Sequence, residues 1–73
     1  MYPNPANNII NIESENYINR VFLFDLNGTL ILEFHNQSNH ATINIENLLS
    51  GFYVVKMFTN DNIITKKLSV IKN

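Results

Sequence analysis

Two histidines and a nearby carboxylate are the first residues whose types could do chemistry. His35 and His40 flank the polar segment 36–39, and a tight turn there would bring their imidazoles close together. A zinc site needs a third and usually a fourth ligand, and Glu33 is the only carboxylate nearby in the sequence. We therefore interpret both histidines as polar residues at the mouth of a loop, and we expect neither a metal nor a cofactor.

Asp25-Leu26-Asn27-Gly28 begins like a calcium-binding loop, whose ligands are carboxylate and amide oxygens. The third oxygen ligand and the closing Glu of such a loop are absent at the required spacing. Asn27-Gly28 between two apolar runs is instead a strong hairpin signal, because both residue types tolerate a positive φ. The segment is therefore predicted to be a hairpin turn.

No group of residues is typical of an enzyme. The sequence has no nucleophile elbow, no Gly-rich phosphate loop and no paired carboxylates in an apolar setting, so it predicts no catalytic residue. Five basic and six acidic residues give a formal net charge of −1, which argues against a nucleic-acid or anionic-membrane partner. The absence of Cys excludes disulfides and thiolate metal sites.

The elements expected to position these residues are short β-strands. The chain has 73 residues, enough for one domain, and its 45% hydrophobic content is too high for a disordered segment. Strand-like runs occur at 9–12, 17–26, 30–35, 40–45, 52–59 and 63–71. Turns are expected between them at Glu13–Asn16, Asn36–Asn39 and Asn60–Asn62. The pattern predicts an all-β fold, an antiparallel β-sandwich of about six to seven short strands.

The predicted strands carry more apolar residues than one face can hold. Five of them lie opposite the more obvious core positions: Phe22, Phe24, Phe52, Val54 and Phe58. A domain this thin cannot bury both faces of every strand. Either these five residues form an exposed patch that contacts another protein, or the inner faces are assigned the wrong way round. Both alternatives remain open.

Four motifs, in order along the chain, resemble those of the type IX secretion system (Por secretion system) C-terminal sorting domain family. They are an opening Tyr-Pro-Asn-Pro, an apolar strand ending in Asp-x-x-Gly, a Leu-x-x-Gly-x-Tyr segment and a closing strand that starts with Lys-Lys. Their residues here are Tyr2, Pro3, Asn4, Pro5, Asp25, Asn27, Gly28, Leu48, Gly51, Tyr53, Lys66 and Lys67. The resemblance covers essentially the whole chain, with Met1 interpreted as an initiator residue placed on an excised domain.

This resemblance implies a secretion signal rather than a catalyst. Members of the family sit at the C-terminus of cargo proteins in the Bacteroidota, and the cargo crosses the inner membrane by the general secretory route. The folded domain, immunoglobulin-like in outline, is recognised by the outer-membrane translocon or a shuttle protein. A surface sortase usually removes it, and the cargo remains on the cell surface or is released.

The same resemblance assigns importance to Gly51, Tyr53, Lys66 and Lys67, either for recognition or for holding the recognised shape. A Cβ at Gly51 would be disfavoured if φ is positive there. Tyr53 is expected to bury its ring and tie down a neighbouring loop through its hydroxyl. If the last strand lies at a sheet edge, it could be read by strand addition, with the two lysines setting specificity.

Two other functions remain open on the sequence alone. A small β-sandwich could be a carbohydrate- or surface-binding module, although no Trp is present to stack on a sugar. It could also be a cap that only stabilises the domain before it. In either case an apolar patch or a free edge strand could pair two copies of the excised domain.

Overall fold

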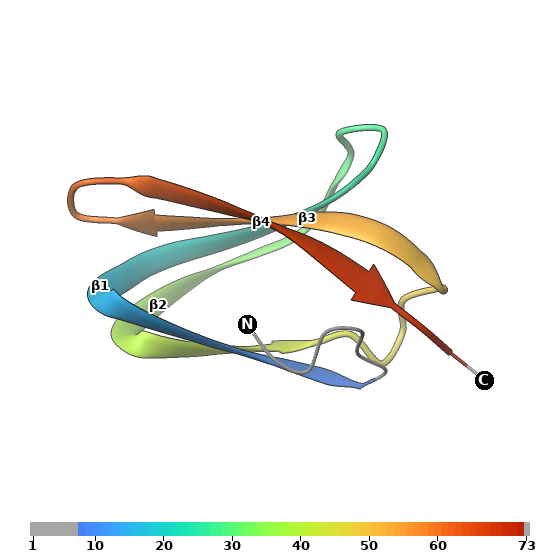
Figure 1. Cartoon of the computed structure of the whole chain (residues 1–73), viewed down its shortest axis with the longest axis horizontal. Helices are drawn as coiled ribbons and strands as arrows, with labels where there is room; N and C mark the ends of the chain where they lie inside the picture. The colour runs from blue at the N-terminus through green and yellow to red at the C-terminus, as the bar shows by residue number, and fades with distance from the viewer. Residues whose placement is uncertain (1–7, 73) are drawn as a thin grey trace.

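The computed structural model describes residues 8–72, and within them the chain forms four strands and no helix. The strands are β1 (Ile9–Asp25), β2 (Leu30–Asn44), β3 (Gly51–Thr59) and β4 (Ile63–Val70). They form one antiparallel sheet in the order β2-β1-β3-β4 (Figure 1). The all-β prediction is confirmed. The opening motif from Tyr2 to Pro5 lies outside the described residues.

The prediction of six to seven strands was wrong for this part of the chain, because two of the expected turns are not turns. β1 runs through Glu13–Asn16 and β2 runs through Asn36–Asn39. Glu13 pairs with His40 and Ile18 pairs with Ser38, so residues 14–17 of β1 face the single residue 39 of β2. The extra residues are absorbed as a large bulge in a long hairpin, and a bulge bends the strand that carries it.

The bend gives the sheet its two layers. The end of the β1–β2 hairpin that carries Ile9–Glu13 and Ala41–Asn44 passes beneath β3 and β4 in the view of Figure 1. The two-sheet sandwich is not confirmed, since the layers belong to one continuous sheet. Between them lies the core of Ile10, Ile12, Ile18, Val21, Leu23, Ala41, Ile43, Ile45, Tyr53, Val55, Met57, Leu68 and Val70. We call the side of β1, β3 and β4 that contacts this core the inner face.

A single amide supports the bent region of the hairpin. Asn36 Nδ2 lies 3.2 Å from the carbonyl oxygen of Ile18, 3.0 Å from that of Ser38 and 3.1 Å from that of His40. The Ser38 hydroxyl also accepts a hydrogen bond from the His40 backbone N–H at 2.9 Å. These bonds partner backbone groups that the irregular pairing would otherwise leave unmatched.

The turn from β1 to β2 is a hairpin, as predicted, but of a different type. Gly28 N–H donates to the Asp25 carbonyl at 3.1 Å, and Asp25 N–H donates to the Thr29 carbonyl at 3.0 Å. Gly28 has a φ of 86°, whereas no non-Gly residue in the described chain has a positive φ, so Asn27 does not. The turn is therefore closed by a glycine bulge rather than by two left-handed residues. The Asp25 carboxylate stabilises it by accepting the backbone N–H groups of Asn27 and Thr29, each at 2.9 Å.

Tyr53 fastens the loop before β3 to the core. Its ring is 8% exposed, and its hydroxyl donates to the Leu49 carbonyl at 2.7 Å. Leu48, in the same loop, packs against the core, and its N–H donates to the Ile45 carbonyl at 3.0 Å. The loop ends at Gly51, which has a φ of 156° and no atom within 4 Å of the place a Cβ would occupy. The loop-fastening hydroxyl matches the sequence-based expectation, and the positive φ meets the condition under which a Cβ at Gly51 would be disfavoured.

Gly28→Ala should lower the free energy of unfolding by about 1–2 kcal/mol, because a side chain is disfavoured at this positive φ. No atom lies near enough to clash, so the loss comes from the backbone alone. Gly28→Asn should lose less, since Asn tolerates left-handed conformations. Urea unfolding of the two variants checks this, and an Ala variant as stable as the unsubstituted protein would contradict the assigned turn.

Tyr53→Phe should lower the free energy of unfolding by about 0.5–1.5 kcal/mol through loss of the hydrogen bond to Leu49. Amide hydrogen exchange of residues 46–50 should speed up at the same time, because the loop loses its anchor. The matched control is Tyr17→Phe, at a ring that is 45% exposed. Equal effects at the two tyrosines would mean that the Tyr53 hydroxyl does not hold the loop.

Candidate recognition surface

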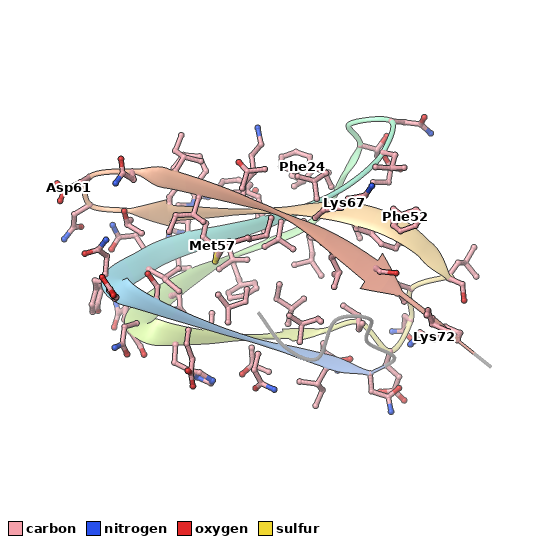
Figure 2. The ribbon with its side chains drawn as sticks, viewed as in Figure 1. Phe24, Phe52, Met57, Asp61, Lys67 and Lys72 are labelled. Atoms are coloured by element: carbon pink, nitrogen blue, oxygen red, sulfur yellow. The ribbon has the colours of Figure 1, made fainter. Side chains whose placement is uncertain are left out.

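The face of the sheet opposite the inner face is built from alternate residues of three strands. Six apolar side chains project from it, and together we call them the outer face: Phe22, Phe24, Phe52, Val54, Phe58 and Ile63. Because successive side chains of a strand point to opposite sides, each lies next to a residue of the inner face. Figure 2 shows Phe24 and Phe52 on one side of the sheet and Met57 between the layers.

The aromatic residues of the outer face pack on one another rather than into the core. The Phe22 and Phe58 rings lie 5.0 Å apart and are tilted by 56°, while Phe22 and Phe24 are stacked 6.3 Å apart. Phe52 remains 51% exposed and Ile63 57% exposed. Of the two alternatives left open by the sequence, the structure therefore supports an exposed patch. Burial of Tyr53, Val55 and Met57 shows that the inner positions were assigned correctly.

Three cations cover the rings of the outer face. The Arg20 guanidinium carbon lies 5.2 Å from the Phe22 ring centroid, and Lys56 Nζ lies 5.7 Å from that of Phe24. Lys67 Nζ lies 4.7 Å from the Phe52 centroid (Figure 2). Such contacts contribute about 0.5–1 kcal/mol each at exposed sites. They hold the ammonium and guanidinium groups against the patch and leave the charges at its surface.

Two carboxylates lie on this side of the sheet. Glu33 pairs with Phe22 across the β1–β2 ladder, and its Oε2 lies 2.6 Å from Arg20 Nη2. Both side chains are about two-fifths exposed, so the ion pair adds little to stability. Asp25 lies at the edge of the outer face, where it lines a hollow together with Phe24 and Lys56. With three positive charges against two negative, this side of the sheet carries an excess of one positive charge on a chain whose net charge is −1.

Lys66 and Lys67 do not act as a pair in space, although they are adjacent in sequence. Lys66 lies opposite the buried Val55 in the ladder, whereas Lys67 lies opposite Val54 of the outer face. Lys66 lines a hollow at the open side of the core together with Glu13 and Glu15. The structure thus places only Lys67 on the aromatic surface. Both residues belong to β4, which is an edge strand of the sheet, as strand addition would require.

Gly51 and Tyr53 are not part of the outer face but support the strand β3, which carries part of it. Gly51 starts β3 in an extended conformation with positive φ, and Tyr53 points into the core. Asp25, Asn27 and Gly28 form the hairpin turn beside the outer face. The recognition role of Gly51 and Tyr53 stays a prediction.

The histidines and Glu33 are not brought together. Across β1 and β2, His35 pairs with Arg20, and His40 pairs with Glu13 on the far side of the bulge. Residues 8–72 contain no group of three or more His, Cys, Asp or Glu side chains placed to hold a metal ion. The described chain also contains no helix that is long and apolar enough to cross a membrane.

The recognition residues expected from the sequence do not include Arg20 or Lys56. Both lie at positions whose alternation with core residues is visible in the sequence, since Arg20 precedes Val21 and Lys56 follows Val55. A search for cations two residues from an aromatic on the outward side of a strand would have found both, and the Arg20 contact with Phe22 lies within β1. What the sequence could not supply is the cross-strand register that places Lys56 over Phe24 and Lys67 over Phe52.

Comparison with known proteins gives one match. The family model described as the secretion system C-terminal sorting domain matches residues 1–72. No curated protein and no solved structure matched the chain. The four motifs, the all-β fold and this match over nearly the whole length agree, and the chain belongs to the family of C-terminal sorting domains of the type IX secretion system.

Proposed function

We propose that this domain carries an N-terminally attached cargo to the outer-membrane translocon of the type IX system as a folded, non-catalytic recognition module. The observation that carries the proposal is the family match over residues 1–72, which makes the domain a C-terminal sorting signal and implies export to the cell surface or secretion. The family is not known for enzymatic activity. The match does not favour a carbohydrate-binding module.

In the proposed route, the cargo reaches the periplasm through the general secretory pathway, and the domain folds there. The translocon or a shuttle protein then engages the domain, and a surface sortase removes it. The cargo ends on the cell surface or in the medium. In support of engagement after folding, the apolar groups best suited to contact a partner come together only when β1, β3 and β4 are assembled.

The predicted recognition residues divide into two roles in this proposal. Gly51 and Tyr53 hold the entry to β3, through a positive φ and through the hydroxyl contact with Leu49. Lys67 reaches a partner directly, because it lies on the outer face. Lys66 faces the acidic hollow that contains Glu13 and Glu15, where its charge is complementary. Its role is therefore to support the recognised shape.

A reporter protein with a general secretory signal, fused ahead of this chain and expressed in a type IX host, should appear at the cell surface or in the medium. The same reporter without the chain should accumulate in the periplasm. Fractionation and protease accessibility of intact cells distinguish the two locations. Periplasmic retention of the fusion would refute the proposed function.

Leu68→Ala in that fusion should prevent export by unfolding the domain. Leu68 is fully buried in β4, and removing such a side chain costs about 2–5 kcal/mol, a large fraction of the stability of a small domain. The matched control is Ile71→Ala, three residues away and 51% exposed, which should change stability by less than about 0.5 kcal/mol. Normal export of an unfolded Leu68→Ala fusion would show that an unfolded peptide is recognised.

A further inference from the structure

We propose that the outer face is the docking surface for an acidic, partly apolar protein surface of the type IX machinery. The proposal rests on the proposed function and deepens it by assigning the face that is read and the chemistry that reads it. Its first support is exposure. Phe52 and Ile63 are each more than half exposed, although each neighbours a well-packed strand position. Contiguous apolar patches of this kind mark contact sites on small proteins.

The arrangement of the outer face is that of a protein interface. Its centre is the packed group Phe22, Phe24 and Phe58, and its cations are Arg20, Lys56 and Lys67. Protein interfaces have an aromatic centre that provides most of the binding energy and a polar rim that sets orientation. The rings are already stacked in the free domain, so a partner would lose little free energy in ordering them.

The charge of this face selects the partner. Three cations against the carboxylates of Glu33 and Asp25 leave one net positive charge on this face, which favours carboxylates on the opposing surface. A second copy of the chain would place these cations against each other, which disfavours self-association through this face. An anionic membrane is disfavoured as well, since lipid-binding segments usually gather about four to eight basic residues. An acidic protein surface with an apolar centre fits both the rings and the cations.

The outer face also has a hollow beside the hairpin turn, which offers a binding place for a side chain of the partner. Phe24 and Val54 line it from the sheet, Lys56 lines it with its charged chain, and Asp25, Leu26 and Gly28 line it from the turn. Leu26 is 63% exposed. An apolar side chain of the partner would fit here against Phe24 and Val54. The glycine bulge of the turn therefore also shapes one end of the docking surface.

The test uses the reporter fusion in a type IX host and compares two double variants. Phe52→Ala/Lys67→Gln changes the outer face, and Ile9→Ala/Lys72→Gln makes the matched changes elsewhere. Ile9 is 48% exposed against 51% for Phe52, and Lys72 lies beyond the end of β4, where its ammonium donates to the Glu46 carbonyl. The outer-face variant should reduce the exported fraction by about tenfold or more, because it removes an exposed ring and a cation from the contact. The control should stay within about twofold of the unsubstituted fusion, as expected for changes outside an interface.

Two results would overturn the proposal and leave the proposed function intact. One is normal export of the outer-face variant, and the other is an equal loss of export in both variants. Failure of the unsubstituted fusion to be exported would instead refute the proposed function. If thermal melting shows that Phe52→Ala/Lys67→Gln is unfolded, Lys67→Glu alone, at an exposed position, decides the outcome.

Further measurements identify the partner class. Lys56→Glu/Lys67→Glu should reduce export more than Lys56→Gln/Lys67→Gln if the opposing surface is acidic, and equal or better export of the Glu variant would overturn that assignment. Sedimentation of the purified chain should detect no dimer whose formation is lost in the Phe52→Ala variant. Phosphatidylcholine vesicles that contain phosphatidylglycerol should show no binding of the chain that is lost in the Lys67→Gln variant. A positive result in either measurement would assign the face to a second copy or to lipid, against the proposal.

Discussion

The bend in the β1–β2 hairpin is the constraint on which the rest of this structure depends. A four-stranded sheet has two faces, and a chain of 73 residues has no helix or second sheet within residues 8–72 to cover either of them. The hairpin solves this for one face by folding its own far end beneath β3 and β4 (Figure 1). Ile10, Ile12 and Ile43 from that end join the same core as Val55 and Leu68. The other face has no such cover in the described chain.

The two faces differ in the kind of apolar residue they carry. The inner face is mainly aliphatic, and its residues in β1 and β3, such as Val21, Leu23 and Val55, are fully buried. The outer face is mainly phenylalanine, whose rings stack along β1, pack at a tilt between β1 and β3, and offer their faces to cations. Aliphatic side chains fill a thin core at high density, whereas large rings bury area on contact with a second surface. The division indicates that the two faces serve stability and contact respectively.

Local patterns in the sequence predicted the parts of the fold that depend on local chemistry. Alternation along β3 identified the buried Tyr53, Val55 and Met57, and Asn27-Gly28 identified the hairpin. The predicted number of strands was wrong because a polar segment has the same sequence pattern whether it forms a turn between two strands or a bulge within one strand. Glu13–Asn16 could have reversed the chain, but residues 14–17 lie opposite the single residue 39 of β2 and form a bulge within a continuous strand. Only the partner strand decides between these outcomes.

The candidate surface was predicted in part for the same reason. The sequence identified the apolar surplus and Lys67, but it treated Lys66 and Lys67 as one feature. Their separation follows from the two-residue period of a strand, which also explains why Lys56 joins the outer face. The contact of Lys67 with Phe52 needs the register of β3 with β4 in addition. Pairing between strands is information that a single sequence does not carry.

The residues of the outer face are far apart along the chain, so whether a partner can recognise them depends on whether the domain is folded. Phe22, Phe52 and Lys67 lie in β1, β3 and β4, with β2 and three connections between the first strand and the last. They share a surface only after β1 pairs with β3 and β3 with β4. An unfolded chain presents the same residues without the surface. A short linear signal would be readable in both states, whereas this surface is readable only in the folded domain. The last strand, β4, completes both the core, through Leu68 and Val70, and the outer face, through Lys67. A partner that recognises this face therefore recognises only a domain in which β4 has paired with β3 and the core has formed.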